Sequence, residues 1–254
     1  MSEFTVERIR PYLLNGTMAE RIQVFDTIDS TNTEAKRLAR LGALEGTTVI
    51  SNHQTAGRGR LGRSFYSPKD TGIYFSMLLR PSIPLEEAVQ VTAAASVAVA
   101  DAVQSVCGNS LWIKWVNDLY HDGKKVCGIL TEAVEDAIVI GIGLNCSTVF
   151  DGELADIAGS LSVDGDEIRC RLAAELVNRI SKLEDAIVNR TWQKEYKERS
   201  MILGKEITVL QEPNRCYLAE DIGDKGELIL VDKNGEKKML TTGEVSIRLH
   251  FGVD

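Results

Sequence analysis

Short apolar runs separated by polar turns dominate the first two hundred residues of the chain. Runs rich in β-branched residues predict strands at 23–29, 47–52, 73–79 and 137–146. Apolar positions spaced three and four residues apart predict helices at 85–106, 166–188 and 192–197. The segment 85–106 is apolar on most of its surface, so we expect a helix buried against a sheet. The first twenty residues predict a short helical lead-in.

The pattern changes at about residue 203. From there to the C-terminus, short β-rich runs alternate with glycine turns, at 207–210, 216–222, 228–231 and 245–249. About fifty residues of this kind predict a small barrel-like domain. We therefore divide the chain into an α+β domain at 1–202 and a small β-domain at 203–254.

Three glycines and three arginines interleave in the segment Gly57-Arg58-Gly59-Arg60-Leu61-Gly62-Arg63. The spacing satisfies G-x-G-x-x-G, but a dinucleotide-binding turn opens directly into a helix, and this segment runs on to Pro68 without helical periodicity. Residues two apart share a face of an extended chain, so we expect Arg58 and Arg60 to point the same way. Guanidinium groups bind carboxylate or phosphate bidentately. The segment is interpreted as a loop that orders around a polyanion, with a solvated basic turn as the alternative.

The segment 112–130 predicts a hairpin with Asp122-Gly123 as its two-residue turn. The expected pairing, Tyr120 with Lys125 and Leu119 with Val126, places four polar side chains on one face: Lys114, Asp118, Tyr120 and Lys125.

On that face, Lys125 and Asp118 become diagonal neighbours roughly 7–8 Å apart. This spacing is too wide for an ion pair and suits a bridging phosphate. One carboxylate helped by the Asn117 amide is typical of Mg²⁺ that arrives with a nucleotide. Lys124 points the opposite way, to solvent. A polar hairpin with surface lysines is the alternative.

Two further segments have a structural and a functional interpretation. Ser30-Thr31-Asn32 precedes an apolar helical stripe, and Thr31 with Glu34 matches a capping box. The same polar groups could receive a ligand at a helix N-terminus. Gly141-Ile142-Gly143-Leu144-Asn145 lies in a predicted strand, where glycines mark either a bulge or the close approach of a ligand or another backbone.

Composition excludes several classes of protein. Hydrophobic residues make up 44% and charged residues 26%, which excludes a disordered chain. The net charge of −8 argues against a protein that wraps nucleic acid. Five widely spaced cysteines form no Cys-x-x-Cys motif, and there are three histidines, so we expect reduced thiols and no zinc site. No signal peptide is expected, and the stretch 88–100 is too short and too polar to span a bilayer. These features predict a cytoplasmic protein.

Together the motifs resemble the biotin protein ligase family, of the monofunctional type without an N-terminal DNA-binding domain. The matching segments occur in the family's order: Ser30-Thr31-Asn32, Gln54 to Arg63, Lys114-Trp115-Val116-Asn117-Asp118-Leu119, Lys125 to Leu130, Gly141 to Asn145, Gly226-Glu227-Leu228 and Gly243 to Arg248. Two positions depart from the family pattern. Val116 replaces a proline, so the turn before Asn117 is expected to be looser, and Phe65 replaces a tryptophan.

The resemblance implies a mixed central sheet flanked by helices, as in class II synthetases, plus a C-terminal SH3-like barrel. It also implies a ligase that joins biotin to ATP as biotinyl-5'-AMP and transfers biotin to a lysine of a biotin carboxyl carrier protein. Mg²⁺ would be held at Asp118. Neither DNA nor a membrane is an expected partner, and formation of a homodimer is left open.

The resemblance assigns site residues to three roles. The catalytic residues would be Lys125, Arg60 and Asp118. Biotin would contact Ser30, Thr31, Asn32, Gln54, Gly57, Arg58, Gly59, Arg60, Lys125, Gly128, Gly141 and Gly143. ATP would contact Arg58, Arg60, Arg63, Asn117, Asp118, Lys125 and Asn145. We expect the loop at 57–63 to be mobile without ligand and to close over the adenylate.

Three alternatives remain. A lipoate-type protein ligase would have a longer and more apolar pocket. A non-catalytic biotin-sensing regulator is opposed by the acidic charge and by the lack of room for a DNA-binding domain. A nucleotide-binding oxidoreductase is disfavoured by the arginines inside the glycine motif.

Overall fold

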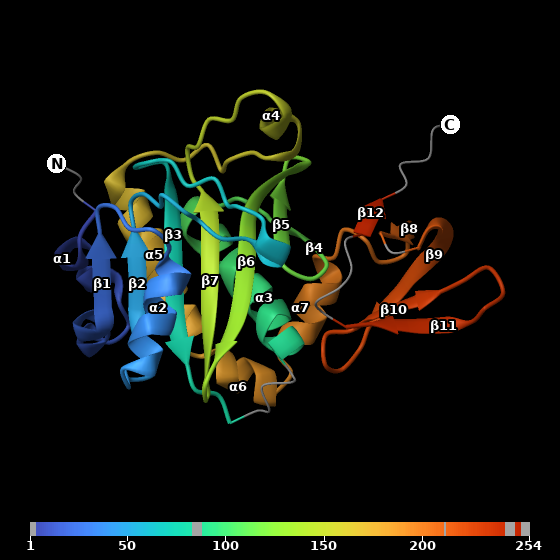
Figure 1. Ribbon diagram of the computed structural model, residues 1–254, viewed down its shortest axis with the longest axis horizontal. Helices are drawn as coiled ribbons and strands as arrows, with labels where there is room; N and C mark the ends of the chain where they lie inside the picture. The colour runs from blue at the N-terminus through green and yellow to red at the C-terminus, as the bar shows by residue number, and fades with distance from the viewer. Residues whose placement is uncertain (1–3, 83–87, 211, 242–246, 250–254) are drawn as a thin grey trace.

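The strands predicted in the first two hundred residues form one seven-stranded mixed sheet (Figure 1). The computed structural model describes residues 4–82, 88–210, 212–241 and 247–249. The strand order is β1-β2-β3-β7-β6-β5-β4, with β1 and β2 parallel and the other neighbours antiparallel. The strands are β1 Ile22–Phe25, β2 Thr48–Ser51, β3 Gly72–Leu79, β4 Trp112–Lys114, β5 Asp118–His121, β6 Lys124–Val134 and β7 Ala137–Asn145. The predicted mixed central sheet is confirmed.

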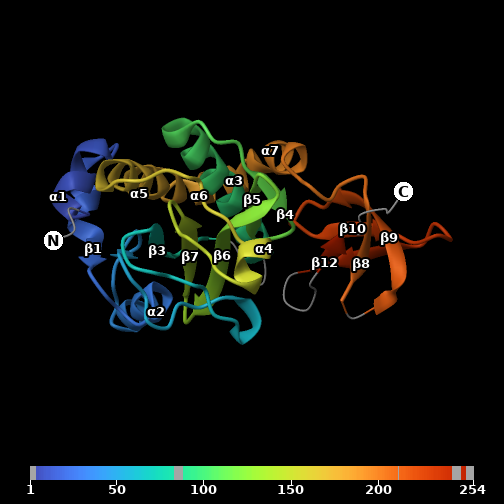
Figure 2. The same ribbon diagram turned by 90° about the horizontal axis from the view of Figure 1, so that it is seen from above.

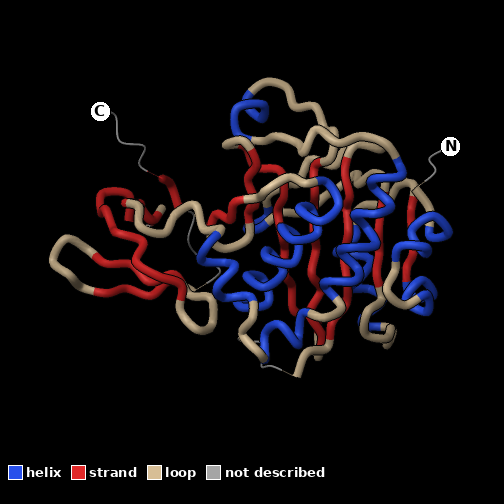
Figure 3. Tube along the Cα trace, turned by 180° about the vertical axis from the view of Figure 1, so that it is seen from behind, coloured by secondary structure: helices blue, strands red, loops and turns tan. Residues whose placement is uncertain are grey.

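Helices cover both faces of the sheet (Figure 2). α2 (Thr31–Arg40) packs on one face, and α3 (Ala88–Cys107) packs with α5 (Asp166–Ile180) on the other. Seen from behind, this second helical layer lies in front of the strands (Figure 3). The shorter helices are α1 Val6–Ile9, η1 Arg10–Tyr12, η2 Gly16–Arg21, η3 Arg60–Gly62, α4 Glu153–Ile157, α6 Leu183–Val188 and α7 Trp192–Glu198.

The helix predicted at 166–188 is two helices, α5 and α6. The break falls at Ser181-Lys182, where the Ser181 hydroxyl donates to the carbonyl oxygen of Asn178 at 3.1 Å. A serine hydroxyl that bonds the backbone in this way competes with the helical hydrogen bonds. The short helix α4 was not predicted.

Helix α3 is long and apolar. Its segment Val89–Cys107 is long and apolar enough to cross a bilayer, so the sequence argument that the stretch was too short is wrong for the whole helix. Most of the segment is buried in the protein, between the sheet and α5. The expected burial against a sheet is therefore confirmed; the predicted start at residue 85 lies outside the described residues.

The C-terminal residues form a separate antiparallel sheet of order β11-β10-β9-β8-β12. Its strands are β8 Glu206–Val209, β9 Glu212–Ile222, β10 Leu228–Val231, β11 Lys237–Leu240 and β12 Ile247–Leu249. Register shifts interrupt both pairings of β9, and such irregularities bend a strand. The expected small β-unit is confirmed, although β11 was not predicted. Residues 243–246 of the family motif lie outside the described residues.

The turn between β9 and β10 makes non-covalent contacts with the larger domain. The carbonyl oxygen of Gly226 accepts a hydrogen bond from the indole Nε1 of Trp115 at 2.9 Å. In the same turn, Asp224 forms an ion pair with Arg190 at 2.9 Å. Gly226 has a φ of +85°, and a Cβ there would lie 3.1 Å from Val89. The small sheet thus contacts both the start of α3 and the segment between β4 and β5.

Candidate active site

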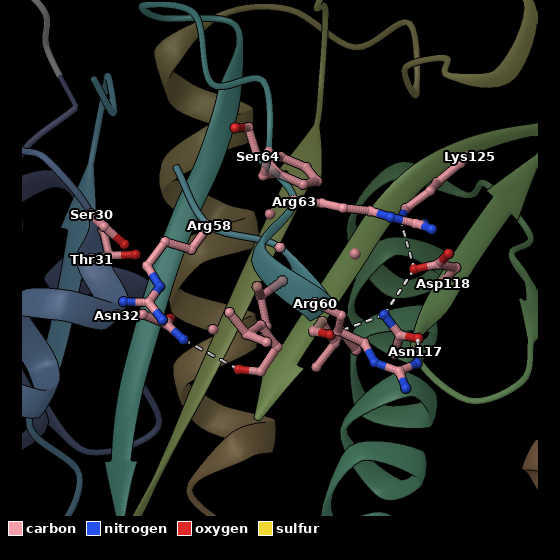
Figure 4. A pocket seen from close by; sticks show the side chains of 18 of the residues that line it. Ser30, Thr31, Asn32, Arg58, Arg60, Arg63, Ser64, Asn117, Asp118 and Lys125 are labelled. Atoms are coloured by element: carbon pink, nitrogen blue, oxygen red, sulfur yellow. Dashed lines mark hydrogen bonds and ion pairs between the residues drawn. The ribbon is translucent and has the colours of Figure 1, made fainter. Parts of the chain in front are cut away.

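A cleft of about 200 Å³ opens between the glycine-arginine loop, the N-terminus of α2 and strands β6 and β7 (Figure 4). It brings together residues that are far apart in the sequence. Of the predicted site residues, these line it: Ser30, Thr31, Asn32, Gln54, Arg58, Gly59, Arg60, Arg63, Asn117, Asp118, Lys125, Gly128, Gly141 and Gly143. Residues that sequence reasoning did not select also line it, among them Lys114, Trp115 and Phe65.

Gly57 and Asn145 are the predicted site residues that do not line the cleft. Gly57 lies in the stem of the loop, where its carbonyl oxygen accepts from the Phe65 amide at 2.9 Å. A Cβ at Gly57 would lie 2.4 Å from the carbonyl oxygen of Phe65, so the stem has no room for a side chain. Asn145 is the last residue of β7, and its side-chain amide donates to the carbonyl oxygen of Gly159 at 3.0 Å. The sequence-based roles of both residues stay predictions.

The α2 end of the cleft is polar and largely buried, and the cation that lines it, Arg58, is paired with Glu132. The predicted capping box of Thr31 with Glu34 is wrong, because Thr31 is already the first residue of α2; the residue before the helix is Ser30, whose side chain makes no capping bond. Thr31 instead donates through its amide (2.9 Å) and its hydroxyl (3.1 Å) to Oε1 of Gln54. Asn32 Oδ1 accepts from the hydroxyl of Ser76, a fully buried residue of β3, at 2.6 Å. These side chains therefore form the wall of the cleft.

Glu132 of β6 is a charged neighbour of this wall that sequence reasoning missed. Its Oε1 accepts from Lys36 at 2.7 Å and from Arg58 at 3.0 Å, and its Oε2 accepts from Asn32 at 3.0 Å. Burial raises the pKa of Glu132, but the hydrogen bonds from Lys36 and Asn32 lower it more, so the net pKa is below the usual value. Strand alternation could have signalled it, since Glu132 follows Leu130 by two residues and shares its face.

The glycines of β7 make room for side chains that line the cleft. A Cβ at Gly141 would lie 1.9 Å from Oδ1 of Asn32, and one at Gly143 would lie 2.4 Å from the ring of Phe65. The pairing of β7 with both neighbours is regular, so the alternative of a bulge is wrong. Phe65 packs edge-on against Tyr74, with ring centroids 6.5 Å apart. The groups that lie close to these two glycines are therefore the side chains of Asn32 and Phe65.

At the other end of the cleft, Lys125 and Asp118 form an ion pair with Nζ 2.7 Å from Oδ1. The prediction that these two residues lie too far apart for an ion pair is wrong. A register shift at Leu119-Tyr120 pairs Leu119 with Cys127 instead of Val126, although Tyr120 pairs with Lys125 as expected. The long Lys125 side chain extends along β6 over Gly128, the residue paired with Asp118, and so reaches the carboxylate. The predicted turn is confirmed: Asp122 and Gly123 both have positive φ, as a type I′ turn requires.

Lys124 lies on the other side of the hairpin from Lys125. It is not simply solvated, because its Nζ donates to the carbonyl oxygen of Ala155 at 2.9 Å. Lys114 lines the cleft beside Asp118 and lies over the ring of Tyr120, 5.8 Å from its centroid. The cleft end that contains Lys125 is therefore strongly cationic.

Arg60 and Arg58 point to opposite ends of the cleft, so the prediction that they share a direction is wrong. Gly59 between them is extended, but Arg60 begins the short helix η3, and the two side chains bind different partners, Arg58 to Glu132 and Arg60 to Asn117. Arg60 donates to Oδ1 of Asn117 at 2.7 Å, and Arg63 points toward the corner occupied by Lys125 (Figure 4). Burial lowers the pKa of Arg60, and nearby Asp118 partly offsets this effect.

The turn between β4 and β5 is held by hydrogen bonds on both sides. The Asn117 amide donates to Asp118 (2.9 Å) and to the carbonyl oxygen of Ile129 (3.1 Å). The Val116 carbonyl accepts from Ser96 (3.1 Å), and the peptide before Val116 is cis. The expectation that valine loosens this turn finds no support in these contacts.

The donor set around Asp118 bears on metal binding. Among the residues that the structure describes, no three His, Cys, Asp or Glu side chains come together. Asp118 supplies one carboxylate, which already pairs with Lys125. This arrangement fits a divalent cation whose other ligands are oxygens of a bound polyphosphate, and does not fit a cation held by the protein alone.

Comparison with known proteins gives matches across both domains. The model of the biotin/lipoate A/B protein ligase family matches residues 24–146, and that of the biotin protein ligase C-terminal domain matches residues 202–248. The "Bifunctional ligase/repressor BirA" of Bacillus spizizenii is 44% identical over 169 residues, covering 63% of this chain and about half (52%) of that relative.

A second relative is matched along most of its length. The "Biotin--[acetyl-CoA-carboxylase] ligase" of Mycobacterium tuberculosis is 31% identical over 242 residues, covering 91% of this chain and 90% of the relative. Among solved structures, the biotin protein ligase of Aquifex aeolicus in complex with biotin and ATP superposes with a TM-score of 0.76 at 28% identity. That superposition covers 90% of this chain and 98% of the other.

Proposed function

The chain belongs to the biotin protein ligase family, and from this premise we propose how its cleft performs the family's reaction. The enzyme activates biotin with ATP and transfers it to a biotin carboxyl carrier protein. In the first step a biotin carboxylate oxygen bonds to the α-phosphorus of ATP and pyrophosphate leaves. In the second step the acceptor lysine nitrogen bonds to the acyl carbon, loses a proton, and AMP leaves.

The observation that supports these roles is the division of the cleft into a polar end, where Arg58 is neutralised by Glu132, and a cationic end. Arg60, Arg63, Lys114 and Lys125 line the cationic end, with Asp118 as the nearby carboxylate. Joining a carboxylate to a triphosphate brings like charges together, and fixed cations offset that repulsion most strongly in the transition state. We assign the reacting carboxylate and the α-phosphate to this end.

Lys125 is the residue best placed to contact both reacting groups. Asp118 holds its ammonium at 2.7 Å, which orients the Lys125 side chain along the cleft wall. When Mg²⁺ is bound with the nucleotide, Asp118 would hold it and the ion would offset phosphate charge. Arg60, already aligned by Asn117, would donate to phosphate or carboxylate oxygens.

The polar end suits the ureido ring of biotin. Ser30, Thr31, Asn32 and Gln54 supply fixed hydrogen-bonding groups, and a few such groups in an otherwise closed slot orient a small ligand. The Phe65 ring above Gly143 would cover the ligand. The loop that carries Phe65 would exclude water from the adenylate, which otherwise hydrolyses.

Pyrophosphate release with biotin and ATP, followed by transfer to a carrier domain, tests the proposed roles. We expect release only when both substrates are present, and labelling of one lysine of the carrier. Lipoate should compete poorly, because it has no ureido group to occupy the polar end. Release driven by lipoate as efficiently as by biotin would overturn the assignment of the polar end.

We also propose a cytoplasmic location. All five cysteines are unpaired. Burial raises the pKa of Cys146 to about 12, so this thiol is unreactive at neutral pH. Unpaired thiols are typical of reducing compartments. Detection of the protein in a fractionated cell tests this, and a light-scattering mass in the presence of biotin and ATP tests whether it forms a homodimer.

A further inference from the structure

We propose that Glu132 is a positioning residue for biotin, which sets the hydrogen-bond pattern of the polar end of the cleft and tethers the loop through Arg58. The inference rests on the proposed function and adds to it a residue outside the sequence motifs interpreted above. Glu132 does not line the cleft, so it acts through Asn32 and Arg58, which do.

The two oxygens of Glu132 serve different partners. Oε1 accepts from Lys36 of α2 (2.7 Å) and from Arg58 of the loop (3.0 Å), and Oε2 accepts from Nδ2 of Asn32 (3.0 Å). The Glu132 side chain is 19% exposed and that of Lys36 is 15% exposed, so this pair is shielded from solvent. Glu132 thereby connects strand β6, helix α2 and the loop.

An ionised carboxylate can only accept hydrogen bonds, and this fixes the orientation of Asn32. Its NH₂ group must face Glu132, so its Oδ1 faces the buried hydroxyl of Ser76 at 2.6 Å. The missing side chain of Gly141 leaves the space in which Oδ1 lies. The carbonyl oxygen of Leu130 also accepts from Nδ2, but at the longer distance of 3.4 Å. Without the carboxylate of Glu132, only this weaker contact would keep the two ends of the Asn32 amide from exchanging places, and an exchange would change the pattern of donors and acceptors.

The orientation of Asn32 is passed on along a chain of side chains. The Ser76 hydroxyl lies 2.8 Å from that of Thr31, which donates to Gln54 at 3.1 Å. Ser76 has one proton to offer to two oxygens, those of Thr31 and Asn32. Ser76 therefore leaves one of these two oxygens, both on residues that line the cleft, without its proton. Such an oxygen favours a ligand that presents N–H donors, as the cyclic urea of biotin does.

The same network reaches both ends of the loop. Gln54 donates to the Ser67 hydroxyl at 2.9 Å, and Ser67 donates to the carbonyl oxygen of Phe65 at 3.0 Å. At the other end, Arg58 pairs with Glu132 directly, but its side chain is 46% exposed. Exposed ion pairs are weak, so Arg58 can leave Glu132 when a ligand arrives. The ion pair with Glu132 thus keeps Arg58 near the cleft, but it is weak enough to break when a ligand binds.

The test compares Glu132→Gln with Glu135→Gln in the full-length enzyme. Glu135 is exposed in the turn that ends the same β-strand, so its substitution is a matched control. In pyrophosphate release, we expect E132Q to raise the KM for biotin about tenfold, equivalent to about 1.4 kcal/mol of binding. The KM for ATP should change little, and E135Q should match the wild type in both KM values.

A second variant separates positioning from charge and guards against a folding defect in E132Q. Glu132→Asp keeps the charge that neutralises Lys36, but its shorter side chain cannot reach both Asn32 and Arg58. We expect E132D to raise the KM for biotin as well. A wild-type biotin KM in folded E132D or E132Q, or an equal rise in the KM for ATP, overturns the inference. Absence of biotin-dependent release in the wild type would instead refute the proposed function.

Discussion

Replacing Lys125 by alanine removes the ammonium that the proposed mechanism places between the biotin carboxylate and the α-phosphate. The change has two electrostatic effects. It deletes one of the cations at that end of the cleft, and it leaves the Asp118 carboxylate, now 2.7 Å from Nζ, without this partner. The reacting anions would then face a carboxylate that is no longer neutralised.

The expected loss follows from distance and exposure. Two unit charges roughly 4 Å apart interact by about 4 kcal/mol at an effective dielectric constant of about 20. Lys125 is 32% exposed and Asp118 is 26% exposed, so solvent screens part of this interaction. We therefore expect the barrier to adenylation to rise by about 1.4–2.7 kcal/mol, a ten- to hundredfold loss of rate.

Pyrophosphate release under single-turnover conditions measures this step directly. Lys124→Ala is the matched control, because Lys124 is the adjacent lysine and its Nζ donates to Ala155 outside the cleft. We expect K124A to release pyrophosphate at the wild-type rate. If K125A does so too, Lys125 has no part in adenylation and the assignment of the cationic end is wrong.

Three other results are expected. Trypsin should cleave at Arg60 more slowly when biotin and ATP are present, and equal cleavage rates by gel analysis would contradict loop closure. Gly143→Ala should raise the KM for biotin about tenfold, because its Cβ would lie 2.4 Å from the ring of Phe65; Gly16→Ala, with open space around it, should have no effect on that KM. The pKa of Glu132 is lowered on folding, so its stabilising effect is present above its usual pKa of 4.5 and is lost as the pH falls below it. The difference in melting temperature between wild type and E132Q should therefore shrink in acid, and a difference that stays constant down to pH 3 (about one unit below the usual range) would refute this.

The sequence predicted local features well when neighbouring residues determine them. The turn at Asp122-Gly123 was found because its positive φ values favour these residue types. The bulge at Leu119-Tyr120 was not found, because nothing in the local pattern distinguishes a shifted register from a regular one. The ion pair of Lys125 with Asp118 was missed for another reason: the lysine side chain is long enough to reach over Gly128 to the residue opposite it.

Long-range polar contacts escaped prediction for a different reason. Glu132 lies 96 residues from Lys36 and 74 from Arg58, and no motif connects them. Ser76 is a buried serine in an apolar strand, and its hydrogen bonds to Thr31 and Asn32 of helix α2 explain it. Most residues of the sequence motifs line the cleft as predicted. The residues that orient them, such as Glu132 and Ser76, belong to no recognisable sequence pattern.

The burial of α3 has a consequence for how the chain must fold. This helix is synthesised before β6, β7 and α5, the elements that later cover it. Until those segments leave the ribosome, a surface apolar enough for a lipid bilayer is exposed to water and to other nascent chains. Truncation after α3 should therefore yield aggregates, and chaperones should associate with the chain at this stage of its synthesis.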